Sequence, residues 1–82
     1  MARASKPVPD SQRRRLLGRL VAAARERRGL TQREVATLLG KRPSAICDYE
    51  VGRREPPGLV LIDLTVVLGI GASDLRGIAR AA

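Results

Sequence analysis

The chain has 82 residues, of which 44% are hydrophobic, so it can form one small domain but not two independent cores, and it is too apolar to be wholly disordered. It contains one cysteine and no histidine, which excludes a disulfide scaffold, a Cys/His zinc site and a histidine-based catalytic triad. Sixteen basic residues against eight acidic ones give a net charge of +8, which indicates a polyanionic partner, either nucleic acid or an anionic membrane surface.

The N-terminal part predicts a flexible basic arm and then a first helix. We place the arm at residues 1–10, which include two prolines, and the folded domain at residues 11–82. Asp10 or Ser11 can cap the first helix. Gly29 supplies the left-handed residue that ends this helix. An apolar stripe at helical spacing runs through it, formed by Leu16, Leu17, Leu20, Val21 and Ala24.

Two short helices follow, separated by a tight turn. The second helix begins with a capping box, in which Thr31 and Glu34 each bond the backbone amide of the other. The third helix spans residues 43–51, with Pro43 in its first turn, where the missing N–H costs nothing. Ile46 and Tyr49 can share its buried face. The buried face of the second helix is predicted to consist of Val35, Ala36, Leu38 and Leu39.

The last third of the chain predicts two more helices after a loop rich in proline. The fourth helix spans about 59–68 and is apolar nearly all round, and the fifth spans about 72–79. Residues 59–62 alone are also compatible with a strand, but no other strand pattern competes strongly. The predicted fold class is therefore all-α.

Most of the positive charge lies at one end of the chain. Residues 1–28 carry nine basic and two acidic residues, a net charge of +7, whereas residues 29–54 carry +2 and residues 55–82 carry −1. This polarisation favours a nucleic-acid interface over a uniformly solubilising surface. Because Tyr49 is the only aromatic residue, a single-strand binder that works by base stacking is disfavoured.

No membrane partner is expected. The longest apolar run, residues 59–62, is far shorter than the ~20 residues that span a bilayer. The basic N-terminus has no apolar stretch behind it that is long enough for a signal peptide. We therefore expect the protein in the cytoplasm, at the nucleoid of a bacterial or phage-infected cell.

A helix, a short turn and a second helix predict a helix-turn-helix, whose second helix is narrow enough to enter the major groove of B-DNA. The motifs that make the pattern specific are residues 29–36, 39–40, 44–46, 49–54 and Pro56. In the order and spacing of these motifs, the chain resembles the phage repressor and Cro helix-turn-helix family over about residues 16–78. The resemblance implies a compact five-helix bundle of the lambda-repressor-like type with a central helix-turn-helix, DNA binding, and repression by a homodimer.

The resemblance also implies which residues contact DNA. In the family, the glutamine at the start of the second helix typically contacts a phosphate, and the loop after the third helix commonly lies on the phosphate backbone. Residues 13–15, three arginines, can also lie along phosphates. The DNA-binding positions in this chain are Gln32, Arg33, Lys41, Arg42, Pro43, Ser44, Cys47, Asp48, Arg53 and Arg54.

Some of these positions depart from the family pattern. Arg42 replaces a small capping residue but offers a guanidinium that suits guanine or phosphate. Asp48 stands where the family more often has a basic or amide residue, so it either accepts from cytosine N4 or pairs within the chain with Arg42 or Lys41. We interpret Cys47 as a substitute for serine rather than as a redox switch.

Two further sets of residues are expected to hold the protein together. The resemblance implies an ion pair between Arg25 and Glu50 that locks the third helix to the first. The fourth helix has more apolar residues than one core face needs, and a symmetric dimer would bury the excess, unless its first residues fold back over the loop at 56–58. We expect the dimer interface to contain Leu59, Val60, Val66 and Ile70.

The sequence thus predicts a regulator that binds double-stranded DNA, most simply a homodimeric repressor on a palindromic operator. An antitoxin with a toxin partner, or the controller of a restriction–modification operon, can use the same fold. A protein of another class, an adaptor that binds an acidic protein through its basic face, would show no preference among DNA sequences. An enzyme is disfavoured because paired carboxylates and a nucleophile–base set are absent from the sequence, and no metal or cofactor is expected.

Overall fold

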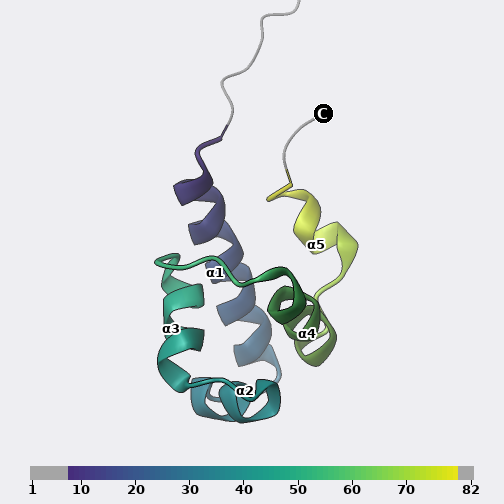
Figure 1. Ribbon diagram of the computed structural model, residues 1–82. Coiled ribbons are helices and arrows are strands. Elements are labelled where there is room, and N and C mark those ends of the chain that lie inside the picture. Colours follow the sequence, from purple (N-terminus) through teal and green to yellow (C-terminus); the bar gives the residue numbers. More distant parts are fainter. Residues whose placement is uncertain (1–7, 80–82) are drawn as a thin grey trace, which may run out of the picture.

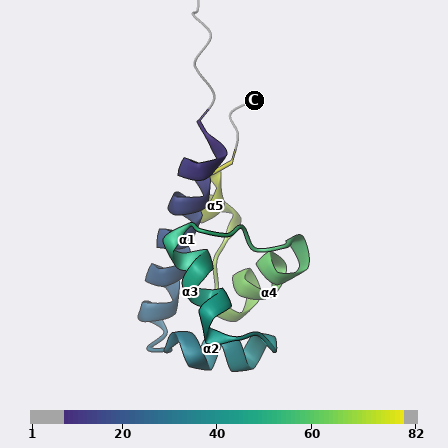
Figure 2. The same ribbon diagram turned by 60° about the vertical axis from the view of Figure 1, so that its left-hand side comes forward.

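The computed structural model describes residues 8–79, which form five α-helices, as the resemblance implied. The longest helix, α1, lies between α3 on one side and α4 on the other, and α5 lies near its N-terminal half (Figure 1). In both ribbon views α2 crosses the opposite end of α1 (Figures 1 and 2). Residues 1–7, most of the expected basic arm, lie outside the described residues. The helices are α1 (Asp10–Arg27), α2 (Gln32–Leu39), α3 (Pro43–Val51), α4 (Gly58–Leu68) and α5 (Ala72–Arg76).

Local signals account for most helix ends. The capping box of α2 is confirmed, because Thr31 Oγ1 accepts the Glu34 amide at 3.0 Å and Glu34 Oε1 accepts the Thr31 amide at 2.9 Å. The predicted cap of α1 was wrong: Pro9 is the N-cap and Asp10 is already helical. The proline fits there because its carbonyl accepts the first amides of the helix. α5 ends at Arg76, before the expected end, since Gly77 is a poor helix former.

The helices α1, α2, α3 and α4 share one hydrophobic core. The predicted stripe of α1 is confirmed, with its centre fully buried and its edges half-buried. Leu38, predicted to be buried on α2, is 61% exposed. The reason is helical phase: the other three apolar residues of α2 share one face, and Leu38 lies about 100° round the helix from it. The core residues are Leu17, Val21, Ala24, Val35, Ala36, Ile46, Tyr49, Val60, Leu64, Leu68 and Ile70.

The backbones of α1 and α3 approach closely. A Cβ atom on Gly18 of α1 would lie 2.2 Å from the carbonyl oxygen of Glu50 and 2.5 Å from that of Tyr49. At the end of α3, a Cβ atom on Gly52 would lie 2.9 Å from the Cα of Arg15. Gly52 also has a φ of 80°, a conformation that other residues rarely adopt. Two glycines therefore let α3 lie directly against α1, which fixes its position in the domain.

Two residues expected at the dimer interface are instead buried within the single chain. Val60 and Ile70 were predicted at a dimer interface, but each is only 6% exposed and belongs to the core of the single chain, so this part of the prediction was wrong. Because nearly every residue of α4 is apolar, the sequence pattern does not reveal which face is buried. The large hydrophobic residues exposed on α4 are Leu59, Ile62 and Val66. Among residues 8–79, the structure has no helix long and apolar enough to cross a membrane.

Candidate nucleic-acid interface

The turn between α2 and α3 presents basic side chains at the start of α3. The Lys41 amide donates to the Ala36 carbonyl at 2.8 Å, which closes the end of α2. Arg42 is the N-cap of α3, and its backbone is extended, with φ −83° and ψ 147°. Pro43 follows as the first helical residue, as predicted. The side chains of Lys41 and Arg42 are exposed beside the first turn of α3.

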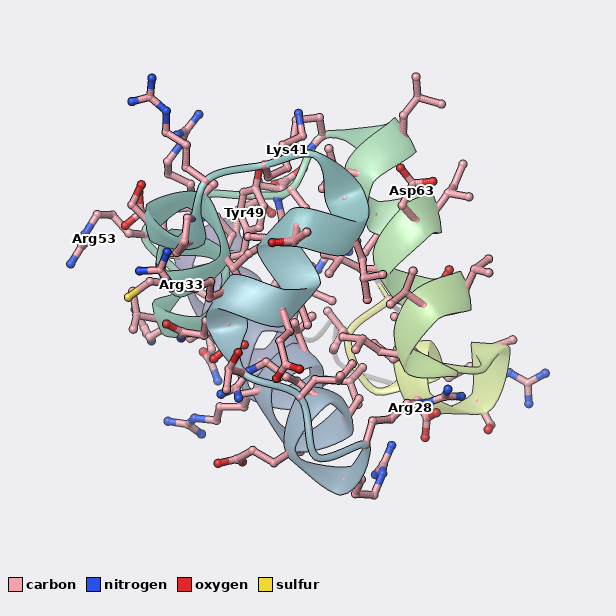
Figure 3. The ribbon with its side chains drawn as sticks, turned by 90° about the horizontal axis from the view of Figure 1, so that it is seen from below. Arg28, Arg33, Lys41, Tyr49, Arg53 and Asp63 are labelled. Atoms are coloured by element: carbon pink, nitrogen blue, oxygen red, sulfur yellow. The ribbon has the colours of Figure 1, made fainter. Side chains whose placement is uncertain are left out.

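All ten residues predicted to contact DNA are at least partly accessible. In Figure 3, Arg33 of α2 and Arg53 after α3 project on the same side of the molecule, whereas Asp63 of α4 lies on the other side. The segment from α2 to the loop after α3 therefore has a basic face that is separate from the apolar face of α4. Arg33, Lys41, Arg42, Ser44, Arg53 and Arg54 are exposed, and Gln32, Pro43, Cys47 and Asp48 are half-buried.

The expected pair of Arg25 and Glu50 is present and forms the centre of a hydrogen-bond network. Arg25 Nε donates to Glu50 Oε2 at 2.6 Å, and its Nη2 donates to Oε1 at 3.1 Å. Arg25 Nη1 also donates to the Leu30 carbonyl at 2.8 Å. The side chains are 15% and 6% exposed, so the pair is largely covered. The hydrogen bond with Glu50 raises the pKa of Arg25 above its usual value, against a smaller lowering by burial, so Arg25 stays charged.

Gln32 belongs to the same network, which the sequence did not predict. Its Nε2 donates to Glu50 Oε1 at 2.9 Å, so the amide at the start of α2 is tied to α3. An amide nitrogen has two N–H groups, and the second can still donate to a phosphate. Glu50 thus connects the end of α1, the start of α2 and the end of α3, and holds Gln32 in a fixed orientation.

Asp48 has a different partner from those expected. Its Oδ1 accepts from Arg53 Nη1, and not from Arg42 or Lys41. The backbone explains the change, since the amides of Arg53 and Arg54 donate to the Asp48 carbonyl at 2.9 and 3.3 Å. The chain therefore turns back along the last turn of α3 after Gly52. A turn of this kind cannot be recognised from charge spacing alone.

The three arginines at 13–15 have separate environments. Arg13 Nε donates to the Ile78 carbonyl at 2.9 Å and so holds the chain after α5 to α1. Arg14 is half-buried, and Arg15 is exposed beside Gly52. Arg15 is therefore the most exposed of the three and lies next to the loop that contains Arg53.

Comparisons with known proteins agree with this geometry. A family model described as "Helix-turn-helix" matches residues 21–75. Multiprotein-bridging factor 1 of Eremothecium gossypii is 38% identical over 61 residues, which are 74% of this chain and 38% of that protein. Human endothelial differentiation-related factor 1 is 36% identical over 61 residues, which are 74% of this chain and 39% of that protein. The chain therefore spans less than two fifths of the length of these relatives.

A solved structure is also similar. The crystal structure of the clp gene regulator ClgR from C. glutamicum aligns with a TM-score of 0.71 and 27% sequence identity. The alignment covers 80% of this chain and 86% of that chain. The similarity thus includes nearly all of the described helices.

Proposed function

The chain belongs to the helix-turn-helix family of the phage repressor and Cro type, a DNA-binding family, and we propose that it is a sequence-specific regulator that represses a promoter as a homodimer. The observation that carries the proposal is the basic, exposed face at the start of α3, on a helix that two glycine contacts and a largely covered ion pair hold in place. Rigid support matters because base edges are recognised by side chains that must be held in a defined geometry.

The dimensions of α3 suit a major groove. An α-helix with its side chains is about 10–12 Å across, which fits the ~12 Å width of the groove, and the nine residues of α3 give it a length of about 13 Å. With α3 in the groove, Arg42 and Ser44 at its start face base edges or phosphates. The start of α2 then faces the backbone, where Gln32 and the free amides of the helix end can bind a phosphate.

We assign the dimer interface to the exposed face of α4. Leu59, Ile62 and Val66 are separated by three and four residues, so they share one side of the helix, and they are 78%, 58% and 74% exposed. Ile62 thus replaces Val60 and Ile70 of the original prediction. A second copy is the natural occupant, because residues 55–82 carry a net charge of only −1 and two such faces repel each other weakly. Such a dimer would place its two α3 helices in half-sites ~34 Å apart.

The DNA proposal is tested by selecting bound duplexes from a random pool and measuring affinity for the recovered site and for a scrambled duplex. A specific regulator binds its own site at least ~10³-fold more tightly, and log affinity falls steeply with log salt for both duplexes. Equal affinity for the two duplexes would exclude a sequence-specific regulator. That outcome would favour an adaptor instead.

The dimer proposal is tested with Val66→Glu in sedimentation equilibrium. A charge on the buried face of a dimer should give monomers, because two unpaired carboxylates would be desolvated there. Leu38→Glu is the matched control, since Leu38 is an exposed leucine on α2, outside the proposed interface. If Val66→Glu remains a dimer, or if both variants dissociate, the α4 assignment is wrong.

A second candidate function is protein bridging, which the name of a relative, multiprotein-bridging factor 1, suggests. The structure offers one feature for it, a shallow groove of about 430 Å³ on α2 that includes Leu30, Thr37 and the exposed Leu38. A bridging protein would use this groove while α3 contacts DNA or a second protein. An antitoxin or a restriction–modification controller would use the α3 surface itself, and the neighbouring reading frames would identify either one.

A further inference from the structure

We propose that Asp48 is a positioning residue, which holds the guanidinium of Arg53 in place for a DNA phosphate and does not itself contact a base. The inference rests on the proposed function, because it assumes that the α3 surface binds DNA. It concerns an acidic residue on a surface that approaches a polyanion, where an uncompensated carboxylate would weaken binding.

The backbone after α3 brings the two side chains together. At Gly52 the chain adopts a left-handed conformation, and the next two amides donate to the Asp48 carbonyl. The segment therefore runs back along the last turn of α3, and Arg53 Nη1 reaches Asp48 Oδ1. Gly52 also lies against the backbone of Arg15, so the path of this turn is fixed from the α1 side as well.

The exposures of the two side chains differ in the way that positioning requires. The Asp48 side chain is only 20% exposed, whereas that of Arg53 is 69% exposed. The carboxylate is therefore mostly covered and paired, while the arginine keeps further N–H groups open to solvent. Those groups are the ones a phosphate would bind, and a guanidinium already held in place loses less side-chain entropy on binding.

If Asp48 positions Arg53, its removal should have opposite effects on the affinity for the specific site and the affinity for random DNA. Without the carboxylate, a mobile Arg53 must be ordered in the specific complex, which weakens it. In random complexes the extra positive charge strengthens binding, because a mobile arginine can reach whichever phosphate is near. A purely structural role for Asp48 would weaken both complexes together. Direct base reading would instead change the preferred base at one position of the site.

The experiment measures the affinity ratio between the selected site and a random duplex for the full chain at several salt concentrations. The variants are Asp48→Asn, Arg53→Gln and the double variant, and Glu26→Gln on α1 is the control for the loss of one exposed carboxylate, outside both the α3 surface and the α4 face. We expect Asp48→Asn to lower the ratio about tenfold while raising random affinity, and Arg53→Gln to lower it about tenfold and reduce the salt slope by about one. The double variant should be no worse than the worse single variant, and Glu26→Gln should keep the wild-type ratio.

A second measurement needs no DNA. In the free protein, ¹⁵N relaxation of the Nε–Hε signal of Arg53 should give the high order parameter of a restrained side chain, and in Asp48→Asn it should fall to that of a mobile arginine. The inference is overturned if this signal is unchanged, if the effects of the two single variants add, or if a repeated selection with Asp48→Asn yields a new base preference. Failure of the proposed function is distinguishable, because the wild-type protein would then bind selected and random duplexes equally.

Discussion

Replacing Gly18 by alanine should push α3 away from α1. The added Cβ atom would lie 2.2 Å from the carbonyl oxygen of Glu50, whereas ordinary contacts of a Cβ atom begin at 3.4 Å. The atom in the way is backbone, so no side chain can rotate to relieve the overlap. The two helices must separate by roughly 1 Å, and the tight packing of the core resists this shift.

Two opposing terms decide the effect of Gly18→Ala on stability. Alanine is a better helix former than glycine by ~1 kcal/mol, which alone would stabilise α1. Overpacking of a well-packed contact costs ~1–3 kcal/mol, and here the overlap is between backbones, so the upper part of that range applies. We therefore expect the free energy of unfolding to fall by about 1–2 kcal/mol, or the Tm to fall by about 5–15 °C for a domain of this size.

Thermal and urea unfolding followed by circular dichroism measure this change. Gly58→Ala is the matched control, because Gly58 is also helical and has no atom within 4 Å of its added Cβ. The control should be neutral or stabilising by up to ~1 kcal/mol. If Gly18→Ala were as stable as the wild-type protein, the close approach of α1 and α3 would be wrong.

Two other predictions concern the hydrogen-bond network around Glu50 and the cap of α2. Glu50→Gln should lower the free energy of unfolding by about 2–3 kcal/mol, because it leaves Arg25 without its countercharge; this value lies between those for exposed and buried ion pairs. A loss below ~1 kcal/mol in urea unfolding would contradict this prediction. The pKa of Glu34 lies below its ordinary value, because its charged form accepts hydrogen bonds from Thr31, first from the backbone amide. The stability that this carboxylate contributes is therefore present at neutral pH and is lost as pH falls through its lowered pKa. Urea unfolding across the acid range should show a smaller loss of stability for Glu34→Gln, and an identical pH profile would count against the cap.

Helix positions could be predicted where the signals are local. The capping box at Thr31 and the proline at 43 mark the starts of α2 and α3, and both helices begin where these residues place them. The ion pair between Arg25 and Glu50 also follows from the resemblance, because both residues stand at matching positions. These features depend on residues close in sequence or on a pattern shared by the family.

Most of the wrong predictions concern positions whose environment is decided by packing between helices and not by the local sequence. Val60 could not be assigned to the core because α4 is apolar on nearly every side, so the face that it buries depends on how it packs. Ile70 follows the end of α4, where no helical pattern indicates the direction of its side chain. The partner of Asp48 depends on the turn at Gly52, and the role of Gly18 depends on a helix 31 residues or more away in the chain. The packing of α4 and the contact at Gly18 have no local signature in a single sequence. The glycine that ends α3 has one, but it does not specify which basic residue pairs with Asp48.

The central claim is that DNA lies on the face formed by the start of α2, the turn and α3. The most direct test is a titration of the full ¹⁵N-labelled chain with the selected duplex, followed by amide chemical shifts. We predict the largest changes at Gln32, in the turn at Lys41 and Arg42, at the start of α3 and at Arg53. The claim is contradicted if the chemical shifts of these amides do not change while those of amides in α5, and on the side of α1 that faces away from α3, do.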